Sequence, residues 1–390
     1  MARARRSRSA PTTHGRKTVH ITGAVLERTG DPVPYTQSQP LTVGELELDG
    51  PGPREVLVRM EAAGVCHSDL SVVDGNRRRP LPMLLGHEGA GIVEEVGRDV
   101  RGLKPGQRVV MTFLPRCEDC AGCATQGIRP CIAGSASNEV GTLLDGDIRL
   151  RRGSETIRHH LGVSAFATHA VVDERSVVPV GNDVPPSVAA LLGCAVLTGG
   201  GTVLNAGKPK PGQRVAVVGL GGVGLAALIT ALALDDVEVI GVDGVDHKLR
   251  AAEKLGASAT YTPADAADNS VRADIVIEAA GNARAFETAV DLTDAGGTTI
   301  TVGLPAPDAR SSISPLALVA GGRSIVGSYL GSAVPSRDVE IFADLWRQSR
   351  LPVEQLVSDT VPLRDINKAM DSLAAGTALR QIIDLEGSHS

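Results

Sequence analysis

Cysteine and histidine side chains that bind zinc well occur in two early stretches of the sequence and in one far downstream. Cys66 lies in GVCHSDL and His87 in LGHEGAG. Cys194 lies in the apolar segment LLGCAVLTGG, where we expect a helix of small residues to begin. Two thiolates and one imidazole fill three positions around a tetrahedral zinc ion, and the open fourth position admits water or substrate. If the fold brings these residues together, they form a catalytic metal site.

Each of these residues alone also has a plain structural interpretation. A cysteine on an apolar helix usually packs as a small hydrophobic side chain, and the sequence distance of Cys194 from the other two decides nothing. His87, however, follows a glycine, which suits a sharp turn, and Asp69 lies close behind Cys66. A carboxylate commonly orients the second ring nitrogen of a ligating histidine, and we assign that role to Asp69. Three histidines have no such spacing, and we place them on the surface or on a pocket wall: His159, His160 and His169.

Four more cysteines form the segment CEDCAGCATQGIRPC. Cys117, Cys120, Cys123 and Cys131 are separated by two, two and seven residues. Four thiolates complete the coordination of zinc and leave no position for substrate, so this group predicts a structural zinc site. An iron–sulfur cluster uses comparable spacing, and a redox disulfide is a further alternative. In a large chain of intracellular character, closely spaced cysteines bind metal more often than they pair.

The segment RVAVVGLGGVGLAALITALALDDVEVIGVD carries a nucleotide-binding pattern. Gly219, Gly221 and Gly224 have the G-x-G-x-x-G spacing between an apolar strand and a helix, and Asp243 ends the next strand. Such glycines permit a tight turn, close approach of the backbone to a pyrophosphate, and close packing of helix on strand. An acid at position 243 would bind the adenosine ribose and repel a 2′-phosphate, so the pattern predicts NAD rather than NADP.

Alternating apolar runs place these motifs on strands and helices. Short β-type runs extend from Thr18 to Val65, and from residue 209 onward strand-like and helix-like runs alternate. Such alternation is typical of a doubly wound parallel sheet, so we predict an α/β protein. The expected divisions are a β-rich domain at 18–195 and 330–390, a Rossmann domain at 196–329, and a disordered basic start at 1–17, for which a transit peptide is the alternative.

The overall composition excludes other classes of protein. Of 390 residues 42% are apolar and 2% aromatic, and the net charge is −6. This acidic balance gives no indication of binding to nucleic acid or to anionic membranes. We also expect no apolar run long enough to span a bilayer. The composition therefore favours a cytoplasmic protein with small-molecule partners.

The order of these motifs is that of a known family. GHEGAGIVEEVG, the four-cysteine segment, GLGGVG with Asp243, and a closing strand near residue 380 follow one another. From about residue 18 onward the chain resembles the zinc-dependent medium-chain alcohol dehydrogenases. The resemblance implies a GroES-like catalytic domain around a Rossmann domain, two zinc ions per chain, NAD, and hydride transfer between an alcohol and an aldehyde. The segment between Cys131 and Val163 is similar to an insertion in the dimeric liver-type and glutathione-linked branch, which implies a homodimer.

The resemblance also implies roles for individual residues. Cys66, His87 and Cys194 would hold the catalytic zinc, and the four clustered cysteines the structural zinc. Asp69 and Glu88 correspond to carboxylates behind the catalytic zinc, and Ser68 to the hydroxyl that takes the proton of the alcohol. The implied cofactor contacts are His67, Thr198, Gly219, Gly221, Gly222, Val223, Gly224, Asp243, Lys248, Val302 and Arg380. The implied apolar wall of the substrate pocket is Phe113, Leu161 and Leu304, which beside the small Ser68 favours a bulky apolar or aromatic primary alcohol.

Two positions depart from the family. Ser71 stands where a histidine often ends the proton relay, so the proton would leave through the ribose and water. Arg77 and Ser135 stand where glutathione-dependent formaldehyde dehydrogenases have the acid and the arginine that bind the thiol adduct. A thiol-adduct-dependent formaldehyde dehydrogenase is the alternative enzyme. A zinc-free reductase would have no reason to keep the three zinc ligands, and the non-enzymatic alternative is a zinc-stabilised, nucleotide-binding regulatory protein.

Overall fold

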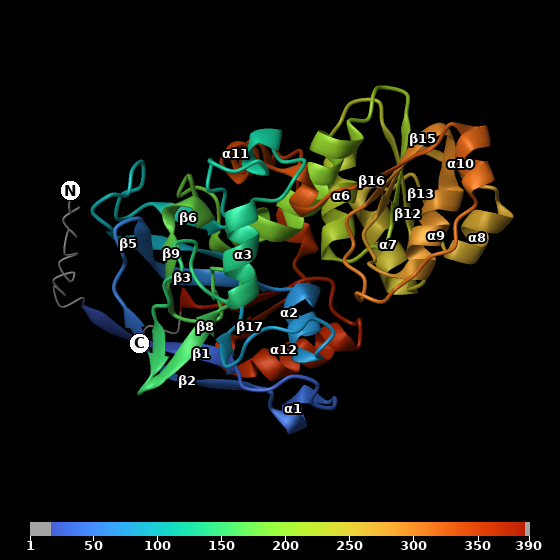
Figure 1. The fold of residues 1–390 in the computed structure, drawn as a ribbon. Coiled ribbons are helices and arrows are strands. Elements are labelled where there is room, and N and C mark those ends of the chain that lie inside the picture. Colours follow the sequence, from blue (N-terminus) through green and yellow to red (C-terminus); the bar gives the residue numbers. More distant parts are fainter. Residues whose placement is uncertain (1–16, 387–390) are drawn as a thin grey trace, which may run out of the picture.

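The structure, a computed structural model, describes residues 17–386 as three β-sheets covered and connected by helices (Figure 1). In Figure 1 the blue and green strands form one half of the molecule, and the yellow and orange strands and helices form the other. The α/β class is therefore as predicted. The arginine-rich start lies outside the described residues, except for Lys17.

The β-rich half contains a small closed barrel and a larger sheet. The barrel joins, in order, β1 (Thr18–Leu26), β2 (Leu41–Asp49), β7 (Leu150–Arg152), β8 (Glu155–His159) and β4 (Met83–Leu84). The larger sheet has the order β10 (Val177–Val180), β6 (Arg108–Met111), β5 (Glu88–Val96), β3 (Glu55–Val65), β18 (Gln381–Asp384) and β17 (Asp359–Pro362), and β9 (His169–Asp173) also pairs with β3. The antiparallel pairing of β18 with β3 confirms the predicted return of the last strand to the first half of the chain.

The other half is built on a six-stranded parallel sheet. Its order is β13 (Ala259–Tyr261), β12 (Glu238–Val242), β11 (Arg214–Val218), β14 (Ala273–Glu278), β15 (Thr293–Thr301) and β16 (Ser324–Gly327). The strand order reverses between β11 and β14, and ligands bind beyond the carboxyl ends of the strands at such a switch point in doubly wound sheets.

The helices are short apart from one long apolar run. They are α1 (Tyr35–Ser38), α2 (His67–Val73), α3 (Ile132–Val140), α4 (Pro186–Leu191), α5 (Leu197–Gly201), α6 (Gly222–Leu232), α7 (Asp246–Leu255), α8 (Pro263–Asp268), α9 (Ala283–Leu292), α10 (Pro315–Gly321), α11 (Pro335–Arg347) and α12 (Ile366–Ala374). Single-turn helices are η1 (Cys123–Thr125), η2 (Glu174–Ser176), η5 (Leu330–Ser332), η6 (Val353–Leu356) and η7 (Leu363–Asp365). The π-helical turns η3 (Leu192–Val196) and η4 (Thr202–Gly207) join α4 and α5 into one run.

This run, 186–207, corrects two expectations. It starts at Pro186, whose fixed φ suits a first helical turn, so Cys194 lies in its middle rather than at its start. It is also 22 residues long with a mean hydropathy of 1.8, enough by length and composition to cross a membrane. Since 89% of that stretch is buried inside the protein, it has the burial of a core helix.

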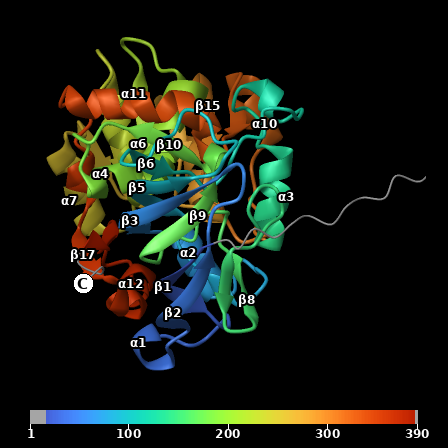
Figure 2. The same cartoon turned by 90° about the vertical axis from the view of Figure 1, so that its left-hand side faces the viewer.

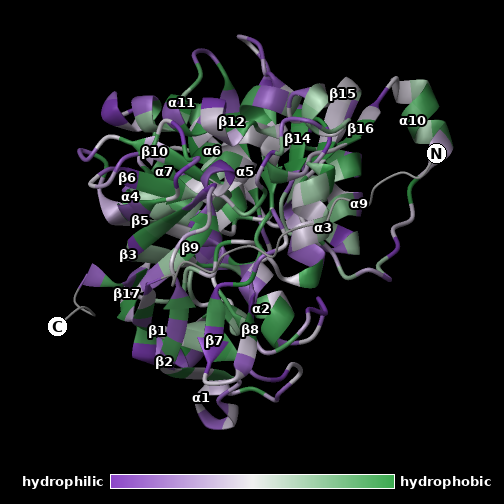
Figure 3. Ribbon diagram, turned by 60° about the vertical axis from the view of Figure 1, so that its left-hand side comes forward, coloured by the Kyte–Doolittle hydropathy of each residue, from purple (hydrophilic) through white to green (hydrophobic). Residues whose placement is uncertain are grey.

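The apolar core is continuous between the two halves. The largest cluster packs the 186–207 run and α11 against α6 and the parallel strands, through residues such as Leu197, Phe342 and Leu228. Figure 2 shows α11 on one side of strands β10, β6, β5 and β3, and α12 and α1 on the opposite side. Figure 3 shows the inner strands and helices mainly in the hydrophobic colour. This shared core fixes the position of one half of the molecule relative to the other.

Candidate metal and nucleotide site

Three segments bring the expected zinc ligands together. Cys66 follows β3 and caps α2, His87 precedes β5, and Cys194 lies in the turn η3. Sγ of Cys194 lies 3.4 Å from Nε2 of His87. The possible ligand atoms of Cys66, His87, Glu88 and Cys194 all lie within 4.8 Å of one another, and the four residues are buried. Two sulfurs and an imidazole nitrogen at this spacing suit a three-ligand zinc site.

A glycine allows the helix to carry Cys194 this deep. A Cβ atom on Gly193 would lie 1.9 Å from the carbonyl oxygen of Met111 in β6. Only glycine therefore permits the helix to pack so closely on that strand. The helix also forms a π-helical turn around Cys194, which changes the direction of a side chain within the helix. Such turns are frequent at functional sites.

Asp69 holds two of the ligands in place. Its Oδ1 lies 3.0 Å from Nδ1 of His87, and its Oδ2 accepts a hydrogen bond from the backbone N–H of Cys66 at 3.2 Å. Burial alone would raise the pKa of Asp69, but the charge of His87 and hydrogen bonds from His160 and His87 lower it. A carboxylate that orients the far nitrogen of a ligating histidine is the arrangement expected behind zinc.

His160 is a neighbour of this site that the sequence did not indicate. It is 1% exposed rather than a surface residue, and its Nδ1 lies 3.2 Å from Oδ1 of Asp69. Its ring meets the His87 ring edge-on, with centroids 5.5 Å apart. His159 is equally buried, with a pKa lowered to about 3 by burial, and only His169 is partly exposed, 3.5 Å from Glu94. No spacing rule relates a histidine at 160 to an acid at 69, so the sequence held no signal for this contact.

Glu88 and Arg380 form a buried ion pair beside the ligands. Nη1 of Arg380 donates to Oε1 of Glu88 at 3.0 Å and to the carbonyl oxygen of Val65 at 3.2 Å. Burial raises the pKa of Glu88 to about 7, although the charge of Arg380 acts against the rise. A Cβ atom on Gly64 would lie 2.3 Å from Oε2 of Glu88, so β3 needs glycine opposite this carboxylate.

The same arginine reaches the start of α6. A Cβ atom on Gly222 would lie 2.3 Å from Nη2 of Arg380, and Nε of Arg380 is a buried donor without a hydrogen-bond partner among the described residues. Helix N-termini bind phosphate through free N–H groups and the helix dipole. An unpaired guanidinium nitrogen at this position has the chemistry to bind a phosphate group.

The glycine pattern forms the turn between β11 and α6. Gly219 has φ +93°, and a Cβ atom there would lie 2.5 Å from the backbone nitrogen of Ala280. A Cβ atom on Gly224 would lie 1.8 Å from the carbonyl oxygen of Gly219. Gly221 precedes the first turn of α6. Gly219 and Gly224 therefore require glycine for geometric reasons, as the pattern implied. The turn lies where the strand order of the sheet reverses.

Asp243 ends β12 next to this turn. Its Oδ2 accepts a hydrogen bond from the backbone N–H of Leu220 at 2.7 Å, and its Oδ1 accepts one from Val245 at 3.0 Å. Two backbone donors hold the carboxylate in a fixed orientation at the edge of the nucleotide cleft. The other residues expected to contact the cofactor line the same cavity: His67, Thr198, Val223, Lys248 and Val302.

One cavity of about 850 Å³ connects the metal ligands with the glycine turn. Cys66, Ser68 and Cys194 line it at one end, and Gly219 and Asp243 line it at the other. A group bound at the cysteines and a nucleotide bound at the glycines would therefore share this one cavity.

Aromatic rings form part of the wall near the cysteines. Phe113 meets the His87 ring edge-on at 5.6 Å, and Tyr329, which the sequence did not single out, meets Phe113 edge-on at 6.0 Å. Leu304 lines the cavity as expected. Leu161 is not among its lining residues in the described part of the chain. It is a buried loop residue with φ 53°.

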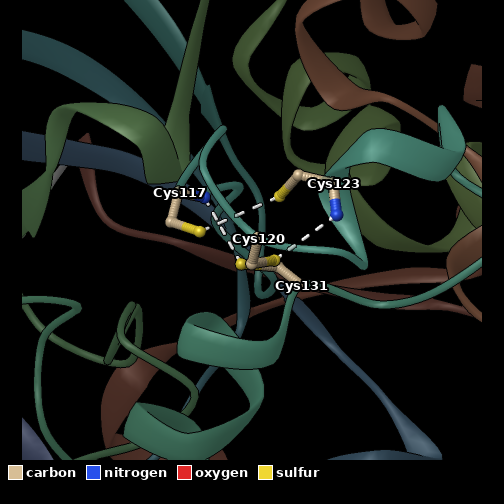
Figure 4. A group of neighbouring side chains, drawn as sticks. All are labelled: Cys117, Cys120, Cys123 and Cys131. Atoms are coloured by element: carbon tan, nitrogen blue, oxygen red, sulfur yellow. Dashed lines mark hydrogen bonds between the residues drawn. The ribbon is translucent and has the colours of Figure 1, made fainter.

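The four clustered cysteines form a separate site on a lobe that packs against the core (Figure 4). Figure 4 shows their sulfur atoms directed toward one another, and all four lie within 4.8 Å. Backbone N–H groups of Ile132 and Cys123 donate to Sγ of Cys120, each at 3.4 Å, and lower its pKa to about 6. Amides that donate to sulfur stabilise thiolates, and all six cysteines are unpaired, which fits metal binding better than a disulfide.

Comparisons with known proteins agree with this fold and site. Residues 52–182 match the alcohol dehydrogenase GroES-like domain, and residues 222–347 match the zinc-binding dehydrogenase domain. A protein of Mycobacterium tuberculosis provisionally named alcohol dehydrogenase D is 34% identical over 361 residues, which is 90% of this chain and 97% of that protein.

Two solved structures are also similar along their whole length. One is an alcohol dehydrogenase zinc-binding domain protein from Burkholderia ambifaria, with 32% identity and a TM-score of 0.87 over 94% of this chain and 99% of that chain. The other is benzyl alcohol dehydrogenase from Acinetobacter calcoaceticus, with 30% identity and a TM-score of 0.85 over the same shares.

The parallel nucleotide-binding sheet, the GroES-like half and the two cysteine sites define a zinc-binding dehydrogenase. The chain belongs to the medium-chain, zinc-binding alcohol dehydrogenase family, whose members are oxidoreductases that act on small-molecule alcohols and aldehydes.

Proposed function

We propose that this protein is a cytoplasmic, zinc-dependent and NAD-linked enzyme that interconverts a bulky apolar or aromatic primary alcohol and its aldehyde. The observation that carries the proposal is the shared cavity, lined by Cys66 and Cys194 at one end and by Gly219 and Asp243 at the other. Hydride transfer requires the reacting carbon to lie beside the nicotinamide. A group of metal-ligating residues and a nucleotide-binding cleft in one cavity meet this requirement.

The catalytic metal would be held by Cys66, His87 and Cys194. A zinc ion there supplies a Lewis acid that lowers the pKa of the alcohol oxygen. Asp69 bonds to both the His87 ring and the Cys66 backbone, so these two ligands keep their orientation before any metal binds. Cys117, Cys120, Cys123 and Cys131 would hold a second, structural zinc ion, so we expect two zinc ions per chain.

The residues around the cavity would handle the proton and hold the cofactor. Ser68, the second residue of α2, lines the cavity beside Cys66 and would accept the proton of the alcohol. Oγ of Ser71 donates to the carbonyl oxygen of His67 at 2.8 Å, so it is engaged within α2 and does not extend a relay. The proton would then leave through the cofactor ribose and water. Thr198 and Val302 would hold the nicotinamide, and Lys248 the adenosine ribose.

The aromatic wall supports the proposed substrate class. Phe113 and Tyr329 present edges and faces on which an aromatic ring packs well. Ser68 is small and leaves room beside the reacting carbon. The similarity to a benzyl alcohol dehydrogenase agrees with this class.

An NAD-reduction screen tests the proposal. Purified protein should reduce NAD with benzylic, terpenoid or long-chain primary alcohols much faster than with secondary alcohols or sugars, and metal analysis should find two zinc ions per chain. Formaldehyde, with and without a small thiol, belongs in the same screen. Oxidation of polyols alone, or activity only with a thiol present, would contradict the proposal.

The first prediction concerns the choice of cofactor. Asp243→Asn should lower kcat/KM for NAD about tenfold, because the ribose loses a charged acceptor. It should also reduce the preference for NAD over NADP, because the charge that repels the 2′-phosphate is gone. Steady-state kinetics with both cofactors measure the effect. Asp246→Asn, on the exposed start of α7, is the matched control and should change neither value. A wild-type preference for NADP would contradict the assignment.

The second prediction concerns a homodimer, which we propose forms through the edge strand β16. In this region Val326 is 40% exposed, and α10 exposes Leu316 (75%) and Val319 (81%). Figure 3 shows α10 mainly in the hydrophobic colour at the outer edge of the molecule. An unpaired strand edge beside apolar side chains suits pairing with a second copy. Light scattering should give twice the mass of the chain, and Val319→Lys should give monomers. Val140→Lys, at an equally apolar exposed site on α3, should remain a dimer. A wild-type monomer would contradict the proposal.

A further inference from the structure

Two arginines follow α2, and neither forms an ion pair with a carboxylate among residues 17–386. Arg77 lines the cavity. Arg79 is not among the lining residues. It is partly buried, its Nη1 donates to the backbone carbonyl oxygen of Asn138 at a long 3.5 Å, and its Nε has no hydrogen-bond partner in the described part of the chain. Within residues 17–386, several other arginines form ion pairs with carboxylates, for example Arg149 with Glu55 at 2.7 Å, but these two do not.

The two arginines lie beside the aromatic wall. Burial lowers the pKa of Arg79, the charge of Arg77 lowers it further, and the attraction of Glu139 is weaker than either. Both arginines also oppose the rise in the pKa of Tyr329 that burial causes. Arg77 also lines the cavity together with Phe113 and Tyr329.

Asn138 connects this pair to the pocket wall. Its Nδ2 donates to the carbonyl oxygen of Phe113 at 2.7 Å, while its own carbonyl oxygen accepts from Arg79. Arg79 is thus joined through one residue to Phe113, whose ring contacts His87. The positive charge of Arg79 therefore lies close to the wall residue Phe113.

We propose that Arg77 binds a carboxylate of the substrate, with Arg79 as a supporting positive charge, so that the enzyme prefers alcohols and aldehydes in which an aromatic or apolar spacer separates the reacting carbon from an anionic group. A guanidinium group offers a planar pair of donors that matches a carboxylate. Two neighbouring, partly buried cations without a counter-ion repel each other, and a bound anion relieves that repulsion. This inference rests on the proposed function, because it defines the substrate of the same site.

A matched pair of substrates tests the inference. Benzyl alcohol and 4-(hydroxymethyl)benzoate share the reacting group and the ring and differ in the carboxylate. We expect the wild-type protein to have a higher kcat/KM for the anionic alcohol than for the neutral one. Arg77→Gln should reduce the ratio of these two values about tenfold, and Arg79→Gln should reduce it less. Arg77→Lys should retain part of the preference, because it keeps the charge without the planar donors. Added salt should also reduce the ratio.

Arg78→Gln is the control, since Arg78 lies between the two arginines in sequence but is exposed and does not line the cavity. Its ratio should equal that of the wild type. An equal fall in this variant would show a general field effect and overturn the inference, as would a wild-type preference for benzyl alcohol that Arg77→Gln leaves unchanged.

Calorimetry separates this inference from the proposed function. Benzoate should bind the zinc-loaded protein more tightly than benzamide, and Arg77→Gln should remove the difference. If neither alcohol is oxidised but benzoate binds through Arg77, the proposed reaction fails and the anion site stands. If benzyl alcohol is oxidised but benzoate and benzamide bind alike, the proposed reaction stands and the anion site is refuted.

Discussion

Cys194→Ala is expected to abolish alcohol oxidation while leaving NAD binding close to normal. The cysteine contributes one of the three proposed zinc ligands, and the Lewis acid contributes several kcal/mol to the reaction, so kcat should fall at least about a thousandfold. The glycine turn and Asp243 lie at the opposite end of the cavity and keep their contacts. Turnover, calorimetric titration with NAD and zinc content measure the three effects, and zinc should fall from two ions per chain to one.

Val196→Ala is the matched control for that variant. Val196 is as deeply buried and belongs to the same π-helical turn, but it has no ligand atom. The smaller side chain should lower the melting temperature through lost packing, at about 1 kcal/mol or more, and retain both zinc ions and most of the activity. Full turnover by Cys194→Ala would mean that the ligand assignment fails.

Cys131→Ser is expected to have the largest effect on stability. Sγ of Cys131 accepts backbone hydrogen bonds from Cys117 and Gly134, each at 3.3 Å, and the residue is fully buried. Structural zinc contributes about 10 kcal/mol or more to the folding of small zinc domains. Loss of even part of this should lower the melting temperature by about 10 °C or more. Differential scanning calorimetry and zinc analysis measure the change.

The damage should extend beyond the lobe. A Cβ atom on Gly127 would lie 2.2 Å from the carbonyl oxygen of Ser332, which shows how closely the lobe packs on the segment that carries Tyr329. Disorder in the lobe would therefore loosen the aromatic wall and raise KM for bulky alcohols. Ser135→Ala, on the exposed face of α3, is the control and should leave the melting temperature unchanged. Iron in place of zinc, or an unchanged melting temperature for Cys131→Ser, would contradict the structural zinc site.

Local patterns in the sequence were sufficient for much of the fold. The glycine pattern, the acid at Asp243 and the four-cysteine group each act within about thirty residues, where strand and helix periods fix the geometry. The six parallel strands and the returning last strand followed from the same periodicity. The helix through Cys194 begins at Pro186, earlier than we predicted. The small and β-branched residues that follow Pro186 gave no clear sign of a helix start.

The contacts that complete the site could not be predicted from local sequence patterns. Cys194 lies 107 residues from His87, and only the family resemblance suggested that they meet. His160 beside Asp69, Tyr329 on Phe113 and the arginines near them depend on how separate loops pack, for which no residue spacing exists. The loop that buries Leu161 is a further example, since its left-handed backbone has no marker in the sequence.

Arg380 has a consequence for the order in which the protein matures. It supports Glu88 beside the metal ligands, abuts the first turn of α6, and directly precedes β18, which pairs with the early strand β3. A chain that ends before this residue has all the expected zinc ligands but lacks this arginine and the pairing of β18 with β3. The cation beside Glu88 is therefore put in place only when the last strand pairs with β3.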